Sequence, residues 1–349
     1  MINWFVLTFG ISTVSAVVSL IMLRRMLRQV TFYCDCSSRP RRAIITGATS
    51  GIGLATAHEL SRRGWSLILA CRNLDAGSAV QKSLLELYRP PSIEVHYLDL
   101  ADLSSISQFV GKLSPNEPID VLINNAGIMS ASRVVVPNLR VDTDMLVNFI
   151  GQFCLFQQLF PFLKSSPDEP SFLPRVIFVS SALGARGTLH TLNSNPLLKC
   201  LPQESWSAQT SYANSKQALN LCAQEIARRF GKGANRSLNV YTVITGGMVN
   251  TNLSRDIFKD LPSPARWLLR GLSGLVLKTP KEGCQSVIHC AISENVYGAH
   301  LLNEGKMEPN QGSGCLYRNC CPVEWPDSSK SAQLAATIYS EVEAIYRKI

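Results

Sequence analysis

Residues 41–53 read RRAIITGATSGIG, a short apolar run followed directly by three glycines among small residues. The run at 43–46 predicts a buried strand, and the amphipathic stretch from Gly53 to Gly64 predicts a helix. A strand that turns straight into a helix places backbone N–H groups where a pyrophosphate can bind, and glycine lets phosphates approach the backbone. The stretch therefore predicts a dinucleotide site formed by Gly47, Thr49, Ser50, Gly51, Ile52 and Gly53.

The alternation of short apolar runs with amphipathic stretches continues along the chain. Five more strands are predicted, beginning at Ser66, Ile93, Val121, Arg175 and Leu238. Strands this apolar are buried on both faces, which favours a parallel sheet with helices on each side. The predicted fold class is α/β, a single Rossmann-type doubly wound parallel sheet with no internal repeat and no second domain.

The composition fits one large globular core with an appendage. The 349 residues are 46% hydrophobic and 17% charged, which excludes disorder as the main state. The net charge is +9, but lysine and arginine cluster only at 24–28 and 39–42. We therefore predict no nucleic-acid partner and assign the excess charge to a membrane flank and a basic cofactor site. Eleven cysteines without metal-type spacing predict reduced thiols in the cytosol and no metal site.

An uncharged apolar stretch, WFVLTFGISTVSAVVSLIML, occupies residues 4–23 and stops at Arg24. It has the length of one membrane-spanning helix. A cleaved signal peptide is the alternative, but no basic region precedes the stretch, the stretch is too long, and charges follow it. We therefore predict a retained N-terminal transmembrane helix in contact with membrane lipid. Because the positive charges follow the helix, the amino terminus is expected in the lumen and the rest of the chain in the cytosol.

The predicted domain organisation follows from this anchor. Residues 1–28 form the N-terminal membrane anchor, residues 29–41 a polar linker, and residues 42–349 the folded domain. The glycosylation sequons at Asn235 and Asn252 then face the cytosol, so we expect both to stay unglycosylated.

Four further motifs follow the glycine-rich turn in order: NNAG at 124–127, VN at 147–148, VSS at 179–181 and YANSK at 212–216. Together with the TGxxxGxG pattern they resemble the short-chain dehydrogenase/reductase superfamily, from about residue 42 to at least residue 253. The resemblance implies a catalytic domain that binds a nicotinamide dinucleotide and transfers a hydride.

Other segments are similar to the retinol-dehydrogenase branch of that superfamily. They are ACRN at 70–73, LDLADLSSI from Leu98, the N-terminal anchor and the tail from Tyr317. The tail also resembles that of the WW-domain-containing oxidoreductase, and GGMVNTNL with LKTPKEGCQS is similar to the X-linked dehydrogenase/reductase that acts on polyprenols. The branch implies a single-pass protein of the endoplasmic reticulum membrane, with lipid droplets as the alternative location.

Tyr212 and Lys216 are four residues apart and therefore share one face of a helix. A neighbouring ammonium favours the phenolate, which is expected to bring the pKa of Tyr212 toward a useful range for acid/base catalysis. Ser181, at a strand end, can hydrogen-bond the substrate oxygen. The resemblance implies that Asn148 holds a proton-relay water and that Lys216 also grips the nicotinamide ribose. Each residue alone is more often structural, but the ordered set behind a phosphate loop indicates catalysis.

The end of the second strand decides the choice of cofactor. An enzyme that prefers NAD usually has an acid there, whereas this chain has Arg72 and Asn73. A basic Arg72 suits a 2′-phosphate and predicts NADP(H), the alternative being a solvated surface arginine. The resemblance implies further contacts to the adenine and nicotinamide, through Asp99, Leu100, Asn125, Ala126, Gly127, Gly247, Val249 and Thr251.

Two departures from the family pattern concern the substrate side. Gly246 replaces the usual proline in TGGMVNT and should make this nicotinamide-facing loop more flexible. A long insertion at 182–211 is expected to roof the substrate site, and His190 within it is expected to be an exposed loop residue rather than a base. The apolar and basic segment 258–280 predicts either a lid that dips into the membrane surface or an amphipathic helix pair over the core.

These observations predict an anchored NADP(H)-dependent oxidoreductase that interconverts a lipophilic alcohol and its aldehyde or ketone, of retinoid, polyprenoid or steroid type. Tyr212 is the expected general acid/base, and a homodimer is one option for the assembly. The alternative is a cofactor-binding scaffold without catalysis, which Gly246 favours and which Ser181, Tyr212 and Lys216 disfavour. A nucleotide-sugar epimerase is disfavoured by the glycine spacing and by the lack of a sugar-binding domain.

Overall fold

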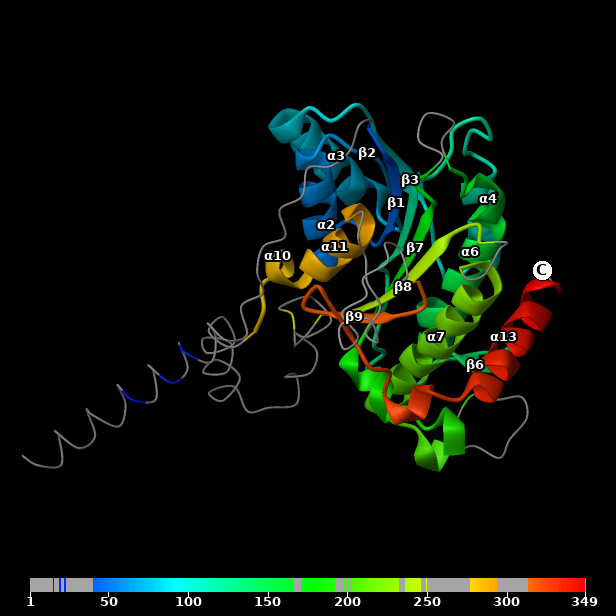
Figure 1. Ribbon diagram of the computed structural model, residues 1–349. Coiled ribbons are helices and arrows are strands. Elements are labelled where there is room, and N and C mark those ends of the chain that lie inside the picture. The colour runs from blue at the N-terminus through cyan, green and yellow to red at the C-terminus, as the bar shows by residue number, and fades with distance from the viewer. Residues whose placement is uncertain are drawn as a thin grey trace, which may run out of the picture.

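A parallel β-sheet forms the centre of the computed structural model (Figure 1). The structure describes residues 40–165, 171–191, 198, 200, 203–231, 236–245, 249, 277–293 and 313–348, with isolated helical positions at 15, 19 and 22. Eight strands lie in the order β10-β9-β8-β7-β4-β1-β2-β3, and all neighbouring pairs are parallel except β9 and β10. The α/β parallel sheet predicted from the sequence is thereby confirmed.

All six predicted strands form and belong to the sheet, in which β3 is an edge strand. They are β1 (Arg42–Thr46), β2 (Ser66–Cys71), β3 (Ile93–Tyr97), β4 (Val121–Asn124), β7 (Arg175–Ser180) and β8 (Asn239–Ile244). The chain runs outward from β1 to β3 and then crosses back to β4 on the other side of β1. The carboxyl ends of β1 and β4 therefore flank the point where the strand order reverses, the usual place for a ligand in such sheets.

The sequence did not predict the last hairpin of the sheet. It consists of β9 (Leu316–Arg318) and β10 (Cys321–Val323), and β9 pairs parallel with β8. Asn319 and Cys320 form the turn with φ of 55° and 60°. Strands of three residues are too short to show a period, which is why the tail carried no strand signal. A second, two-stranded sheet pairs β5 (Val135–Val136) with β6 (Val141–Asp142).

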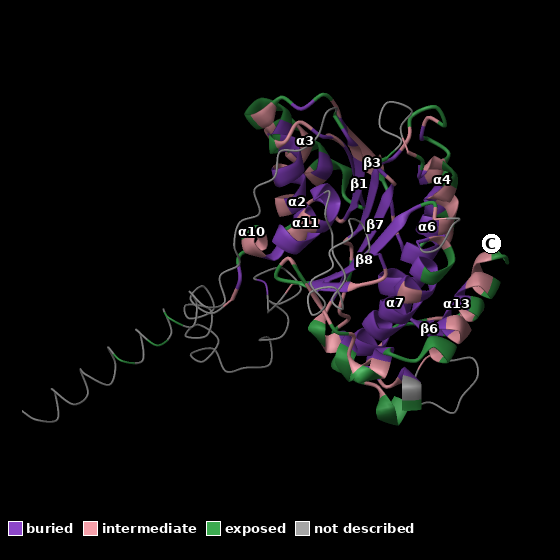
Figure 2. Ribbon diagram, in the orientation of Figure 1, coloured by how far each residue is buried: buried purple, intermediate pink, exposed green. Residues whose placement is uncertain are grey.

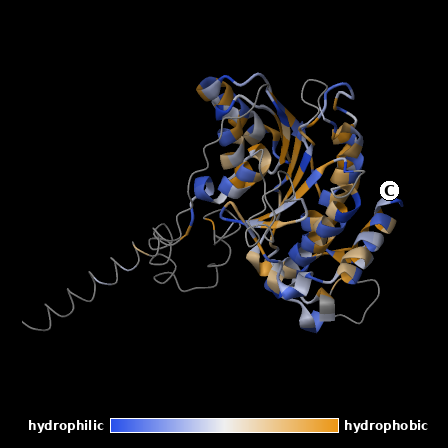
Figure 3. Ribbon diagram, viewed as in Figure 1, coloured by the Kyte–Doolittle hydropathy of each residue, from blue (hydrophilic) through white to orange (hydrophobic). Residues whose placement is uncertain are grey.

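Helices cover both faces of the sheet, so the fold has three layers (Figure 1). Successive residues of a strand point to opposite faces. Accordingly Ile44 belongs to one hydrophobic core, and Ala43 and Ile45 belong to the other. The strands are buried and apolar between the layers (Figures 2 and 3). One layer holds α2 (Gly51–Arg62), α3 (Leu74–Tyr88), α10 (Pro280–Gly283) and α11 (Gln285–Ile292), and the other holds α4 (Leu103–Val110), α6 (Gly151–Leu159), α7 (Ala208–Phe230) and α13 (Ala332–Tyr346).

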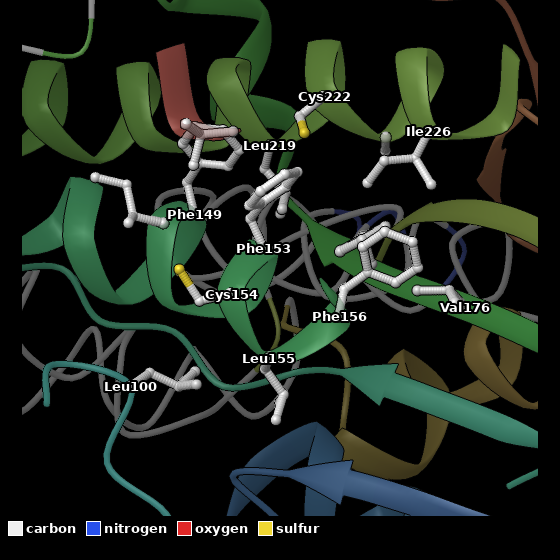
Figure 4. Close-up of a cluster of buried hydrophobic side chains, with 14 of the residues drawn as sticks. Leu100, Phe149, Phe153, Cys154, Leu155, Phe156, Val176, Leu219, Cys222 and Ile226 are labelled. Carbon is white, nitrogen blue, oxygen red and sulfur yellow. The ribbon is translucent and has the colours of Figure 1, made fainter. Parts of the chain in front are cut away.

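The core between α6 and α7 is built from aromatic side chains. Phe149, Phe153 and Phe156 lie between the sheet and α7 and point toward Leu219 and its neighbours on that helix (Figure 4). Phe149 belongs to a π-turn, η1 (Leu146–Ile150), which joins α5 (Thr143–Met145) to α6. This packing fixes α7, and with it the YANSK motif, against the end of β7.

Only the helical segment Thr143–Phe162 in the described part of the chain is long and apolar enough to cross a membrane, and 72% of its apolar window is buried in the protein. It is the core helix just described. The anchor predicted at 4–23 lies outside the described residues except at the isolated helical positions 15, 19 and 22. The same holds for Gly246, both sequons and most of the segment 258–280.

The side chain of Arg41 packs against the folded domain. Arg41, placed at the end of the linker from the sequence, is buried, and its guanidinium carbon lies 3.6 Å from the centre of the Phe172 ring. Such a stack stabilises a buried cation. Arg175, which opens β7, stacks on the same ring at 4.4 Å.

Candidate active site

The turn between β1 and α2 has the geometry of a phosphate-binding loop. Gly47 and Gly51 adopt the left-handed conformation, with φ of 66° and 56°. α2 starts at Gly51, two residues earlier than predicted, and the hydroxyl of its N-cap Ser50 makes no capping hydrogen bond. The first turn of α2 also lacks an acidic residue. Among the described residues, neither the N-cap nor the first turn thus offers these N–H groups a side-chain acceptor, which leaves them available to an anion.

Asn125 holds this turn closed from the neighbouring strand. Its Nδ2 donates to the carbonyl oxygens of Thr46 at 2.8 Å and Gly47 at 3.3 Å. The backbone N–H groups of Asn125 and Ala126 both donate to Thr46 Oγ1 at 2.9 Å. A Cβ at Gly53 would lie 2.5 Å from Asn125 Nδ2, so only glycine fits there. The structure thus places the predicted Asn125 behind the phosphate loop as its support.

Tyr212 and Lys216 lie on α7 where that helix meets the end of β7. Both side chains are buried, and Lys216 Nζ donates to the Val179 carbonyl oxygen at 3.0 Å. Ser181 directly follows β7 and caps the 3₁₀ turn η3 (Ala182–Arg186) by accepting from Leu183 N at 3.2 Å. The Ser181 hydroxyl also interacts with the Tyr212 hydroxyl. Three of the four predicted catalytic residues are therefore side by side.

Asn148 is connected to the same helix. Its Oδ1 accepts from Ile128 N at 2.7 Å, and its Nδ2 donates to Ile128 O at 2.8 Å and to Ser215 Oγ at 2.9 Å. Ser215 Oγ in turn donates to the Tyr212 carbonyl oxygen at 2.7 Å. Asn148 lies in the π-turn η1, and such turns are frequent at functional sites. The side chain thus ties three segments together, and the predicted water-holding role stays a prediction.

Burial controls the proton affinities at this site. It raises the pKa of Tyr212 to about 12; the Ser181 side chain lowers that pKa, and the charge of Asp144 raises it. Burial lowers the pKa of Lys216 to about 8, against the opposing effect of Asp144. The expected fall in the pKa of Tyr212 beside Lys216 is therefore not seen in the protein by itself. Lys216 Nζ lies 5.9 Å from the ring centre, and burial outweighs it.

The residues predicted to select the cofactor lie at the carboxyl ends of β2 and β3. Arg72 is exposed and has no hydrogen-bond or ion-pair partner among the described residues. Asn73 caps α3, since its Oδ1 accepts from Ala76 N at 2.9 Å. Asp99 Oδ1 accepts from Ala101 N at 2.9 Å. Leu100 is buried in the core. Of these four, Arg72 is thus the side chain with no hydrogen bond to the described residues.

Two further predicted residues border the same region. A Cβ at Gly127 would lie 3.2 Å from Asn148 Oδ1 and 3.4 Å from Lys216 Nζ, so the glycine leaves room beside the lysine. Val249 is buried and forms a parallel bridge with Lys278. Thr49 and Ile52 are half-buried in the loop and at the start of α2. Gly247 and Thr251 lie outside the described residues.

Sequence reasoning missed three side chains at the site: Ser215, Asp144 and Gln152. Gln152 Nε2 donates to the Ala126 carbonyl oxygen at 2.6 Å, and Asp144 accepts from Ser130. Asp144, Asn148 and Gln152 are spaced four residues apart, and residues at this spacing share a helix face. This four-residue spacing from Asn148 is the sequence feature that could have identified Asp144 and Gln152.

The described part of the 182–211 insertion packs on α7. Asn214 Oδ1 accepts from Thr188 N at 2.7 Å, and Gln217 Oε1 accepts from Leu189 N at 2.9 Å. Two short 3₁₀ turns lie in it, η4 (Leu189–Thr191) and η5 (Gln203–Ser205). The predicted roof over the substrate stays a prediction, and the side chain of His190 lies outside the described residues.

Comparison with known proteins fits this geometry. Residues 41–193 match the sequence profile of the short chain dehydrogenase family. Bovine dehydrogenase/reductase SDR family member 13 is 36% identical over 308 residues, which cover 87% of this chain and 72% of that protein. The chain belongs to the short-chain dehydrogenase/reductase family. It is therefore an oxidoreductase of a family that uses a nicotinamide dinucleotide.

Other relatives confirm the predicted retinol-dehydrogenase-like branch. Human polyprenol dehydrogenase is 34% identical over 276 residues, 76% of this chain and 78% of that protein. Mouse retinol dehydrogenase 14 is 35% identical over 269 residues, 74% of this chain and 75% of that protein. A solved structure of an uncharacterised Mycobacterium paratuberculosis protein has a TM-score of 0.63 at 25% identity and covers 91% of this chain and 98% of its own.

Proposed function

We propose that this chain is an NADP(H)-dependent oxidoreductase that interconverts a lipophilic alcohol and its aldehyde or ketone, with Tyr212 as general acid/base. The observation that carries the proposal is the meeting of Ser181, Tyr212 and Lys216 at the end of β7, beside a glycine-rich turn with uncapped N–H groups. Family membership supports the reaction class.

The residues fit a nicotinamide dinucleotide. The N–H groups at the start of α2 would bind its pyrophosphate, and Lys216 would hold the nicotinamide ribose in the space that Gly127 leaves. The unpaired Arg72 would bind the 2′-phosphate of NADP(H). When bound, the cofactor supplies or accepts the hydride. Asn73 and Leu100 contribute through the backbone that they position, because their side chains are engaged elsewhere.

Tyr212 handles the proton. In reduction its hydroxyl donates a proton to the carbonyl oxygen, and the product is an alcohol with one added hydride and one added proton. In oxidation the phenolate accepts the proton of the alcohol. A pKa raised to about 12 keeps Tyr212 protonated at neutral pH, the form that donates the proton in reduction. Ser181 would donate a hydrogen bond to the same substrate oxygen.

The Lys216 ammonium has enough N–H donors for both the nicotinamide ribose and the Tyr212 side. An ammonium carries three N–H donors, of which one goes to the Val179 carbonyl oxygen. The other two would point to the ribose hydroxyls and toward the Tyr212 side, where a positive charge stabilises the phenolate. Asn148 would complete the route by which a proton reaches Lys216, as the family resemblance implies.

The substrate proposal rests on the relatives and on the apolar amino terminus. Retinol and polyprenol dehydrogenases act on alcohols that dissolve in membranes, and steroids share this property. A helix at 4–23 would hold the domain at the cytosolic face of the endoplasmic reticulum membrane, where such substrates are concentrated.

The proposed topology is tested with microsomes. The microsomal protein should resist carbonate extraction, and protease added to sealed vesicles should destroy the domain. Protection of the domain in sealed vesicles would overturn this topology. A homodimer stays a prediction.

The function is tested with full-length protein purified in detergent. Retinal, a polyprenal and a steroid ketone are offered with NADPH or NADH, and the corresponding alcohols with the oxidised cofactors. We expect turnover of at least one lipid carbonyl, and faster turnover with NADPH. Tight NADPH binding by fluorescence titration without turnover of any of these compounds would instead favour the scaffold alternative.

A further inference from the structure

Asp144 is a buried carboxyl next to the proposed catalytic residues. It lies in α5, one helical turn before Asn148, and is 1% exposed. Its Oδ1 accepts hydrogen bonds from Ser130 N at 3.0 Å and from Ser130 Oγ at 2.6 Å. Its Oδ2 is also shielded from solvent. Burying a carboxyl group costs free energy, so the position calls for a function beyond holding Ser130.

The groups that face Asp144 come from two elements. The short helix α5 packs against α7. From α7 the facing groups are Lys216 and Tyr212, whose pKa values the charge of Asp144 raises, and Ser211, which donates a hydrogen bond to the carboxyl. The group from β6 that faces Asp144 is Asp142, which forms an ion pair with Arg133 at 3.4 Å. Asp144 has no ion-pair partner among the described residues, so its charge acts at short range on the catalytic helix.

The charge of Asp144 shifts the pKa values of Tyr212 and Lys216 in the same direction. Burial raises the pKa of Asp144 itself, yet at the alkaline pH where tyrosine and lysine titrate the carboxyl is ionised. A negative charge favours the protonated form of a neighbour. It therefore raises the pKa of Tyr212 and that of Lys216.

We propose that Asp144 is a positioning residue that sets the pH range of proton transfer by Tyr212, because it holds a negative charge behind the Tyr212–Lys216 pair while it anchors the Ser130 loop. The proposal rests on the proposed function of Tyr212. Asp144 then keeps the tyrosine protonated to higher pH, so that oxidation, which needs the phenolate, requires a higher pH.

The first test compares the pH profiles of Asp144→Asn and wild-type protein. Asparagine keeps the acceptor for Ser130 and removes the charge. We expect the pH midpoint of alcohol oxidation to fall by about one unit, the lower end of what one neighbouring charge produces. Asp142→Asn is the matched control, because Asp142 is not among the groups that act on Tyr212 or Lys216. Equal midpoints in wild type and Asp144→Asn would overturn the proposal.

The second test needs no turnover. The Lys216 side chain is titrated by NMR in full-length protein labelled with 13C-lysine, and its signal is assigned by its absence in Lys216→Met. The midpoint should fall in Asp144→Asn and stay unchanged in Asp142→Asn. An unchanged midpoint in a folded Asp144→Asn protein overturns the proposal, even if the enzyme is active. A fallen midpoint in a protein without any turnover supports the role of Asp144 and contradicts the proposed function alone.

Discussion

Asn148 Nδ2 donates a hydrogen bond of 2.9 Å to Ser215 Oγ, across 67 residues of sequence. Ser215 lies between Tyr212 and Lys216 on α7, and its hydroxyl passes a hydrogen bond on to the Tyr212 carbonyl oxygen. The π-turn that carries Asn148 is thereby connected to the helix that carries the proposed catalytic pair. Ser215 thus links Asn148 to the backbone of Tyr212.

Ser215→Ala should reduce kcat more than it reduces cofactor binding. The change leaves a buried amide donor of Asn148 without its partner, which costs about 1–3 kcal/mol, and it removes the hydrogen bond from Ser215 to the Tyr212 carbonyl oxygen. Ser313→Ala is the matched control, because Ser313 is also buried and accepts from Val240 N at 3.1 Å, beside the C-cap Gly231 at the opposite end of α7 from Tyr212. Both variants should melt at lower temperature. A normal kcat in folded Ser215→Ala would show that the link is structural only.

Gly53→Ala should weaken cofactor binding at least tenfold. The added Cβ meets the Gly47 carbonyl and the Asn125 side chain, and such overpacking typically costs about 1–3 kcal/mol. Gly111→Ala serves as control, since Gly111 has an ordinary helical φ of −62° and nearest atoms at 3.3 Å. Fluorescence titration with NADPH measures the effect. Undiminished affinity in Gly53→Ala would place the pyrophosphate elsewhere.

Arg72→Ala should raise the KM for NADPH far more than the KM for NADH. Only the phosphorylated cofactor loses a charge-assisted contact, which is worth roughly 1.5–3 kcal/mol, or about ten- to a hundredfold. Lys82→Ala removes the same charge from an exposed site on α3 and should affect both cofactors little. Equal increases for the two cofactors in Arg72→Ala would identify Arg72 as a solvated surface residue.

Lys216→Met should stabilise the protein at neutral pH while it abolishes activity. The pKa of Lys216 is lowered from 10.5 to about 8, so between these values the folded protein binds fewer protons than the unfolded chain. Wild-type stability therefore rises with pH across this window, by on the order of 3 kcal/mol. Denaturant unfolding at pH 7 and pH 10 should show the advantage of the variant shrinking as the pH rises. If the free energies of unfolding of wild type and variant differed by the same amount at pH 7 and pH 10, folding would not lower the pKa of Lys216.

The parts of the site that depend on neighbouring residues in the chain were predictable. The strand, glycine turn and helix at 42–62 follow each other directly, and Tyr212 and Lys216 share a face because of their spacing. The partners of Asn148 were not predictable, since Ile128 and Ser215 reach it only through tertiary packing.

The sequence pattern also did not show which side chains of the site are buried. The spacing of Tyr212 and Lys216 predicts an ammonium near a phenol and hence a lowered pKa, but both groups are buried, and the pKa of Tyr212 rises instead. Likewise, the sequence does not distinguish Asp144 from the other acidic residues, whereas its burial in the structure does. Residues 316–318 pair with β8, and residues 321–323 pair with residues 316–318, so these strands depend on an edge that distant residues supply.

Turnover and cofactor binding of Tyr212→Phe test the central claim most directly. The variant loses only the hydroxyl that moves the proton, and the ring stays packed in its buried position. General acid/base catalysis contributes about 10²–10⁴-fold, so kcat on the best lipid carbonyl should fall at least about a hundredfold while the Kd for NADPH stays within about threefold. A Tyr212→Phe protein that keeps more than about a tenth of wild-type turnover would contradict the account.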